Sequence, residues 1–247
     1  MFANLFSIGN GSVAESSAGI AGAAVVSRDF GQVWVRHSER RQGIGTKLLQ
    51  AAEQDAPLDV LRFAAATLEP AAAPFLAANG YHKEWEVWLM GVDVTNESRA
   101  PAWPDGIVVR TFEEEDAAVV KELLDEAYAG DPDYVPLSIE HWRTFMLGDP
   151  SYDPRVWFLA IAGDEPVGAV LNWKEGYVKD LVVSPGWRGR GLGKALMLQT
   201  FAEFRRRGIP CVTLKTDSNN PTEAGRFYER LGMTIDRTYE VFEKRLR

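Results

Sequence analysis

A short basic stretch with alternating glycines carries the clearest chemical signal in the sequence. It reads Arg-Gly-Arg-Gly-Leu-Gly-Lys over Arg188–Lys194, between a β-branched run and an apolar-periodic helix. Glycines let a backbone pass close to a ligand, and the unpaired N–H groups and positive dipole end of the following helix favour an anion. With two arginines and a lysine around it, the stretch predicts an anion site that a pyrophosphate fits.

The spacing of the glycines excludes two other nucleotide loops. A dinucleotide fingerprint needs a further glycine three residues on, and no glycine stands three residues after Gly193. A phosphate loop of the Walker type needs Ser or Thr after Gly-Lys, whereas Lys194 is followed by Ala195. A tight β–α turn that binds nothing is the alternative to an anion site.

The elements around this loop occur twice, in the same order. Residues 33–53 and 181–201 each read as a β-branched run, a polar turn, an Arg-x-x-Gly-x-Gly loop and an apolar-periodic helix. After each loop and helix come a second strand, a short helix ending near glycine and a closing strand: residues 60–65, 74–81 and 86–94, then 210–215, 226–233 and 238–246. This internal repeat predicts two related domains.

A linker separates the two halves. Residues 96–106 hold two prolines and polar residues without periodicity, so we predict domains at 1–97 and 107–247, of the α/β class with a mixed α+β sheet. The second domain adds a strand, two helices and a strand pair before its loop: Ile107–Phe112, Glu113–Ala129, Leu137–Leu147 with Ser138 as a candidate cap, and Val156–Ala162 with Pro166–Trp173. Only about thirty-five residues precede the first loop. They leave room for two strands, so the N-terminal domain is predicted to be truncated, with a misread chain start as the alternative.

The composition narrows the class of protein. The chain has 247 residues, 46% of them hydrophobic, and a net charge of −8, which argues against nucleic acid or an anionic membrane as partner. We find no membrane-spanning run and no signal peptide. Three histidines without ligand spacing predict no metal. The single Cys211 fits a reducing cytoplasm and reads as a buried strand residue, with a nucleophile as the alternative. The sequence carries no signal for an oligomeric state.

Two motifs resemble those of the Gcn5-related N-acetyltransferase (GNAT) superfamily. Residues 182–194 are similar to the acetyl-CoA motif, and residues 219–233 to the motif that follows it, with Ala224, Tyr228 and Gly232 in register. The resemblance covers most of residues 107–246. The repeated arrangement resembles tandem-GNAT acetyltransferases of the mycothiol synthase kind, in which the C-terminal domain is catalytic.

The resemblance implies how acetyl-CoA is held. The mixed sheet splays after the Tyr177–Val183 strand, the pantetheine arm bonds the free edge of that strand, and the pyrophosphate sits on the loop amides. The N–H group of Val183 is the candidate oxyanion donor. The residues expected to bind the cofactor are Val182, Val183, Arg188, Gly189, Arg190, Gly191, Leu192, Gly193, Lys194 and Asn220.

The resemblance also implies a general acid. Tyr228 matches the tyrosine of the family motif, and a phenol holds its proton at neutral pH yet can donate it to a leaving thiolate. A tyrosine packed on the helix face beside Phe227 is the alternative.

The base is one of two carboxylates. Asp180 lies on the splayed strand and Glu175 just before it, and either can take a proton directly or through water. A surface ion pair is the alternative for each. Strand alternation predicts that Asp180 lies on the face opposite Lys179 and Leu181.

The first half keeps the loop at Arg40–Gly45 but not the acid. Counting back from Gly80 as from Gly232, the acid position holds Leu76, which donates no proton. The Asn-Pro element is also absent. We interpret this half as a non-catalytic GNAT domain that packs against the active one, and its binding of CoA stays open.

Acidic residues dominate the segment that covers the acceptor site in the family's layout. Residues 113–153 hold twelve acidic and two basic side chains. The candidates for attracting a cationic amine are Asp131, Asp133, Asp149 and Asp153, and the candidates for pocket walls are Tyr134, His141 and Trp142. Solvated helix faces, caps and turns are the alternative.

The predicted function is acetyl transfer from acetyl-CoA to the primary amine of a small molecule, by direct attack. The alternatives are a peptide or protein N-acetyltransferase and a CoA-binding sensor without turnover.

Overall fold

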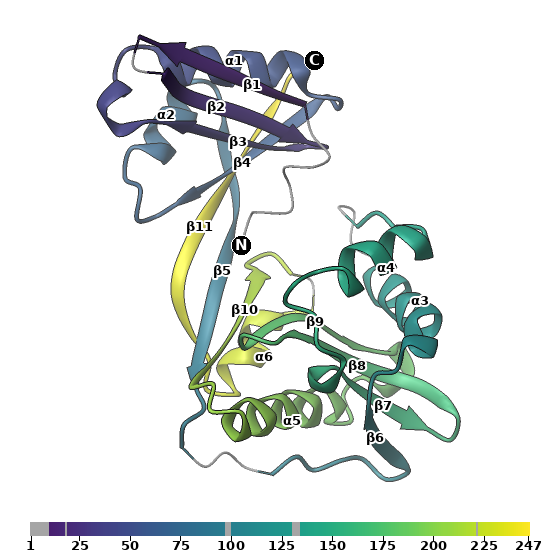
Figure 1. Cartoon of the computed structure of the whole chain (residues 1–247). Helices are drawn as coiled ribbons and strands as arrows, with labels where there is room; N and C mark the ends of the chain where they lie inside the picture. The colour runs from purple at the N-terminus through teal and green to yellow at the C-terminus, as the bar shows by residue number, and fades with distance from the viewer. Residues whose placement is uncertain (1–9, 18, 97–99, 130–133, 221) are drawn as a thin grey trace. The chain divides into compact units, whose positions relative to one another are not determined.

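The computed structural model describes residues 10–17, 19–96, 100–129, 134–220 and 222–247 (Figure 1). The chain forms two compact units. The first comprises residues 1–88, 217–225 and 237–247, and the second comprises residues 89–216 and 226–236. Strands β5 (His82–Asp93) and β11 (Thr234–Arg245) contribute residues to both units. The domain boundaries 1–97 and 107–247 stay a proposal. No helix of the described chain is long and apolar enough to cross a membrane.

The first unit orders its strands β1-β2-β3-β4-β11. They are β1 (Asn10–Ser16), β2 (Gly19–Ser27), β3 (Phe30–Val35), β4 (Val60–Ala66) and β11. Helices α1 (Ile44–Asp55) and α2 (Ala72–Ala78) supply Leu48, Leu49 and Leu76 to a core that also contains Leu61 and Phe63. Three strands precede the loop, where the sequence predicted two. The third fits because two-residue connections join β1 to β2 and β2 to β3.

The second unit orders its strands β10-β9-β8-β7-β6, antiparallel except for the parallel pair β9 and β10. They are β6 (Ile107–Thr111), β7 (Phe158–Ala162), β8 (Glu165–Trp173), β9 (Tyr177–Val183) and β10 (Cys211–Asp217). The helices are α3 (Ala117–Tyr128), α4 (Ile139–Leu147), α5 (Leu192–Arg206) and α6 (Ala224–Glu229). The Ser138 hydroxyl accepts from His141 N at 3.3 Å and caps α4 as predicted.

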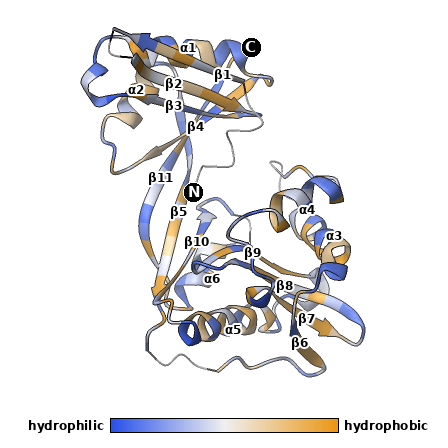
Figure 2. Cartoon of the chain, in the orientation of Figure 1, coloured by the Kyte–Doolittle hydropathy of each residue, from blue (hydrophilic) through white to orange (hydrophobic). Residues whose placement is uncertain are grey.

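Strand β8 is buried on both faces. Every residue from Val167 to Trp173 is buried, although successive side chains point to opposite faces of a sheet. Helices α3 and α5 both contact β8, so they cover its two faces. Figure 2 shows that α5 carries both hydrophobic and hydrophilic residues, as expected of a helix with one side toward the core and one toward solvent.

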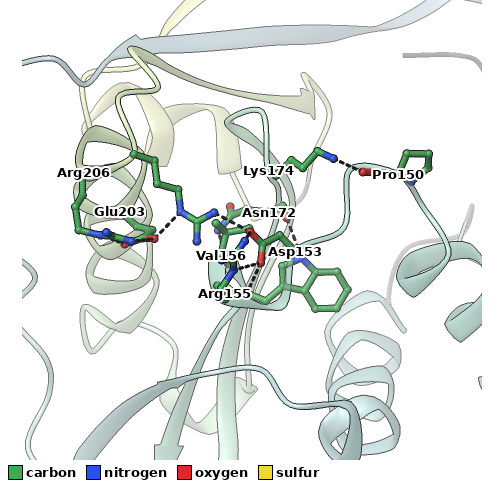
Figure 3. Close-up of polar contacts among 10 residues, drawn as sticks. Pro150, Asp153, Arg155, Val156, Asn172, Lys174, Glu203 and Arg206 are labelled. Atoms are coloured by element: carbon green, nitrogen blue, oxygen red, sulfur yellow. Dashed lines mark hydrogen bonds and ion pairs between the residues drawn. The ribbon is translucent and has the colours of Figure 1, made fainter.

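An ion-pair network around the buried Asp153 ties the segment before β7 to the end of α5 (Figure 3). Asp153 accepts from Arg155 Nε at 2.8 Å and from Arg207 NH1 at 2.7 Å. Arg207 also donates to Glu203 at 2.6 Å. The hydrogen bonds from Arg155 and Arg207 hold the pKa of the Asp153 carboxyl well below its usual range, although burial opposes the shift.

A buried asparagine fastens the same segment to β8. Asn172 Nδ2 donates to Val156 O at 2.6 Å and to Thr200 Oγ1 at 3.2 Å, and Trp157 Nε1 donates to Asn172 O at 2.8 Å. Because buried polar groups cost free energy unless they are bonded, these contacts fix the entry into β7.

The two glycine loops share their geometry. Arg40 Nε donates to Val35 O at 3.3 Å, and Arg188 Nε donates to Val183 O at 3.1 Å, each reaching back five residues to the end of its strand. Each following helix is preceded by a glycine in the left-handed region, at φ 79° for Gly43 and 87° for Gly191. The predicted repeat is therefore present at the level of individual hydrogen bonds.

The first loop carries one strained residue. Arg41 has φ 65°, whereas the equivalent position of the second loop is Gly189 at φ 73°. A non-glycine residue in the left-handed region costs about 1–2 kcal/mol. Glycine removes this cost, but it also gives the unfolded chain more conformational entropy, which cancels part of the gain. We expect Arg41→Gly to raise the free energy of unfolding by about 0.5–1 kcal/mol, measured by urea denaturation. Gln42→Gly, next to it and without a positive φ, should lower stability instead, and equal effects of the two substitutions would contradict this reading.

Candidate active site

The sheet of the second unit opens along β9. Strand β10 pairs with β9 only at Thr213↔Tyr177 and Leu214↔Val178. From Lys179 onward, this edge of β9 has no neighbouring strand in the part of the second unit that the structure describes. The splay implied by the family resemblance is present, and it leaves backbone groups free to bind an extended ligand.

A β-bulge interrupts β9 where the opening begins. Leu171 lies opposite Asp180 and Asn172 opposite Val178, so Lys179 is the extra residue. The prediction from regular alternation was wrong here, because a bulge re-aims side chains. Lys179 and Asp180 line the same pocket, with Lys179 Nζ 3.4 Å from Asp180 Oδ2.

Asp180 is surrounded by tyrosines. The Tyr128 hydroxyl donates to Asp180 Oδ1 at 3.1 Å, and the Tyr128 ring lies 5.2 Å from the ring of Tyr134. Burial, and then the charge of Asp180, raises the pKa of Tyr128 well above its ordinary value. The same two causes raise the pKa of Tyr177 to about 12. These phenols stay protonated at neutral pH.

Tyr228 belongs to this group. Burial, followed by the charges of Asp180 and then Tyr177, raises its pKa above the ordinary value. Since the Asp180 charge acts on Tyr228, the candidate acid and the candidate base share one electrostatic environment. The ring of Tyr228 also contacts Phe227, with centroids 5.2 Å apart, so packing on the helix face accompanies this placement.

The other candidate base lies elsewhere. Glu175 is exposed in the turn between β8 and β9 and does not line the pocket beside Asp180. It is not among the groups whose charge shifts the pKa of Tyr128, Tyr177 or Tyr228. Of the two carboxylates, Asp180 is the one that the fold brings to the tyrosines.

The loop before α5 fits a pyrophosphate. Gly189 and Gly191 adopt positive φ, and an added Cβ at either would meet nothing within 4 Å, so the backbone is open to a ligand. The first intrahelical bond runs from Ala195 N to Gly191 O at 3.0 Å, and the amides before it are the unpaired donors of a helix start. The side chains of Arg190 and Lys194 are exposed beside them. These features favour the loop as the pyrophosphate site, and the assignment of its residues to the cofactor stays a prediction.

The two valines at the end of β9, Val182 and Val183, differ in what they present to the open edge of the strand. The Val182 side chain is buried and packs the sheet. Ser184 N donates to Val167 O at 2.9 Å, and successive N–H groups alternate between the edges of a strand. The N–H of Val183 therefore points to the open edge, away from β8, as an oxyanion donor must.

Asn220 has a structural bond in the first unit. Its Oδ1 accepts from Thr222 N at 2.9 Å and from Thr222 Oγ1 at 2.6 Å, which forms a local turn. A role of Asn220 toward the cofactor stays a prediction.

A pocket of about 130 Å³ adjoins Asp180. Helix α3, helix α4 and the bulge of β9 form its walls, and Tyr134 and Trp142 line it as the sequence suggested. His141 is exposed and is not part of the lining.

The acidic residues expected there have other roles. Asp153 is buried in the ion pairs with Arg155 and Arg207, and Asp149 Oδ1 accepts from Ser151 N at 2.7 Å in a turn. Neither lines the pocket, so this part of the prediction was wrong. Asp131 and Asp133 lie outside the described residues.

Cys211 also differs from its prediction. It begins β10 as expected, but it is exposed rather than buried. The first residue of a strand has fewer neighbours than the middle, where Val212 is fully buried.

The first unit repeats the frame of the site without its tyrosine. Tyr81 N donates to Leu76 O at 3.1 Å, and Met233 N donates to Tyr228 O at 3.1 Å, so Leu76 and Tyr228 occupy the same position of equivalent helix ends. Leu76 is buried in the core of its unit.

The comparisons with known proteins agree with this geometry. Residues 117–233 match the family model described as Acetyltransferase (GNAT) family, and residues 8–83 match that of an Acetyltransferase (GNAT) domain. The chain belongs to the GNAT acetyltransferase family, with two such domains in tandem. It is therefore an acetyltransferase, and acetyl-CoA is its acetyl donor.

Individual relatives in sequence include mycothiol acetyltransferases. The chain is 33% identical to a mycothiol acetyltransferase of Thermobispora bispora, over 83% of this chain and 72% of that protein. It is 31% identical to the mycothiol acetyltransferase of Catenulispora acidiphila, over 82% and 68%.

Solved structures share the fold. A GCN5-related N-acetyltransferase from Sphaerobacter thermophilus superposes with a TM-score of 0.80 at 26% identity, covering 96% of this chain and 81% of that one. A tandem GNAT protein from the clavulanic acid biosynthesis pathway gives a TM-score of 0.72 at 19% identity, over 98% and 84%.

Proposed function

We propose that the chain moves an acetyl group from acetyl-CoA to the primary amine of a small molecule, by direct attack at the second unit. The observation that carries this proposal is the shared environment of Asp180 and Tyr228 beside the open edge of β9. The mycothiol acetyltransferases among its relatives favour a small-molecule acceptor.

Asp180 serves as the base. It takes a proton from the attacking amine, directly or through one water, because an amine with a pKa near ~10 is otherwise protonated at neutral pH. The nitrogen forms a bond to the thioester carbonyl carbon, and the N–H group of Val183 donates to the developing oxyanion. The exposed amides and basic side chains of Arg188–Lys194 hold the pyrophosphate.

Tyr228 serves as the acid. As the carbon–sulfur bond breaks, the phenol donates its proton to the departing thiolate. The raised pKa of Tyr228 keeps it protonated before the reaction. The first unit, with Leu76 in the equivalent position, contributes no such step.

The test is amine-dependent release of CoA. The chain is incubated with acetyl-CoA and a panel of amines: alkylamines, arylalkylamines, glucosamine, polyamines, aminoglycosides, short peptides and the acceptor of the mycothiol acetyltransferases. Release with a small amine, and acetylated product by mass spectrometry, would support the proposal. Release with peptides alone would favour a peptide acetyltransferase, and confirmed acetyl-CoA binding without any release would favour a sensor.

Tyr128 positions the base. Its hydrogen bond to Asp180 restrains the carboxylate. We expect Tyr128→Phe to lower kcat about 3–10-fold in steady-state CoA release, because about 1 kcal/mol of hydrogen bonding that holds the base in place is lost.

Tyr152→Phe is the matched control for this substitution. The Tyr152 hydroxyl is buried without a hydrogen-bond partner among the described residues, so its loss should leave kcat unchanged. A Tyr128→Phe enzyme with the wild-type kcat would show that Tyr128 only packs.

A further inference from the structure

The pocket beside Asp180 is built mainly from apolar and aromatic groups. Eight of its eleven lining residues are of this kind, among them Tyr128, Tyr134, Trp142 and Phe145. Trp142 is buried against Trp157, with ring centroids 6.2 Å apart, which fixes one wall. Such a lining favours an apolar group, because removing apolar surface from water stabilises a complex by roughly 25 cal/mol per Å².

The size of the pocket limits that group. Its volume is about 130 Å³, and an apolar cavity of about 150 Å³ holds one benzene molecule. A single ring therefore fills the space. A disaccharide or a fused polycyclic group would not fit wholly inside it.

The polar side chains of the lining are already paired. Tyr128 and Lys179 both contact Asp180, and Tyr134 and Lys121 both contact Asp125. A sugar ring in this space would compete for these partners or leave its own hydroxyls without bonds, which costs about 1–3 kcal/mol for each buried group. A hydrocarbon ring leaves every one of these bonds in place.

The same pairing removes excess negative charge. Among the described residues, the two carboxylates that contact lining side chains each have a lysine against them, Lys179 for Asp180 and Lys121 for Asp125. A second ammonium group of a polyamine or aminoglycoside would meet these two lysines, and the carboxylates beside them are already paired. The pocket thus offers one polar end, at Asp180, and an apolar interior.

We propose that this pocket receives the apolar ring of the acceptor, so that the acceptor is a small primary amine carrying one hydrocarbon ring, an arylalkylamine in chemical class. This inference rests on the proposed function, because Asp180 is the base that the amine must reach. The ring lies among Tyr134, Trp142 and Phe145, and the amine nitrogen lies at Asp180.

The first experiment compares acceptors in steady-state CoA release. Benzylamine and 2-phenylethylamine should have kcat/KM values at least tenfold above those of methylamine, glucosamine and putrescine. Phe145→Ala opens the wall at a residue that is 41% exposed, so the fold tolerates it, and should reduce this preference at least threefold. Val108→Ala removes an exposed valine of β6 outside the pocket and should keep the wild-type preference.

A second experiment separates the pocket from the chemistry. Benzyl alcohol carries the ring without an amine, and its binding to the whole chain in the presence of CoA is followed by saturation-transfer NMR. Binding that weakens in Phe145→Ala but not in Val108→Ala supports the pocket even if no amine is acetylated, an outcome that would overturn the proposed function alone. Efficient acetylation of glucosamine or putrescine without binding of benzyl alcohol would overturn the inference and leave the proposed function standing.

Discussion

Tyr228→Phe should lower kcat by about 100-fold or more at neutral pH, because general acids contribute about 10²–10⁴ to such a step. The substitution removes one oxygen and keeps the ring that packs against Phe227. The KM for acetyl-CoA should change little, since the loop before α5 is untouched. Steady-state CoA release with the best amine of the panel provides the measurement.

The equivalent position of the first unit supplies the control. Leu76 and Tyr228 share the same backbone hydrogen-bond pattern, so Leu76→Ile alters the corresponding helix without touching an acid and should leave kcat within twofold. Wild-type turnover in Tyr228→Phe would remove the tyrosine from the mechanism and reopen the choice of active unit.

Asp153→Ala should lower the free energy of unfolding by about 3 kcal/mol, because removing one partner of a buried pair leaves the other charge uncompensated. The Asp153 side chain is 9% exposed and Arg207 is 18% exposed. Glu203 still contacts Arg207 in the variant, which keeps the expected loss at the low end of the range for buried pairs. Urea denaturation followed by tryptophan fluorescence measures it.

The stabilisation that Asp153 contributes depends on pH. The folded-state pKa of Asp153 is depressed, first by hydrogen bonding from Arg155 and then by Arg207. Its stabilisation is therefore present above about pH 4, the ordinary value for aspartate, and is lost as the pH falls below it. The difference between wild type and Asp153→Ala should shrink on acidification.

Arg155→Ala is the matched variant for this network. Arg155 contacts the same carboxylate, but its side chain is 78% exposed, and exposed pairs contribute about 0–1 kcal/mol. A loss in Asp153→Ala no larger than that in Arg155→Ala would show that the buried pair with Arg207 adds nothing.

Local sequence patterns predicted most of the frame of the site. The period of the apolar residues and the glycine spacing placed α5 and its loop, and a hydroxyl ahead of a helix identified the cap at Ser138. These features depend on residues within one or two turns of each other. The repeated order of elements then gave the tandem arrangement, which the family matches confirm.

The contents of the pocket depend on contacts distant in sequence. The bulge at Lys179 is a register shift between β8 and β9. The residue type at that position does not predict a bulge. The sequence offers Asp153 as a candidate for the acceptor site because its charge can be read locally, whereas its partner Arg207 lies 54 positions away. Tyr128 was missed for the same reason, since its partner Asp180 lies 52 residues further on.

The arginine that reaches back to the end of its strand is present in both loops. It fastens the loop to the sheet whether or not anything is bound, so selection for stability alone can preserve it. A search of genomes for this loop would therefore find domains that keep the loop only for stability together with domains that use it in catalysis. The residue four positions before the glycine that follows the later short helix is tyrosine in one copy (Tyr228) and leucine in the other (Leu76). This residue is the better marker, because it distinguishes a copy that holds the proposed acid from one that does not.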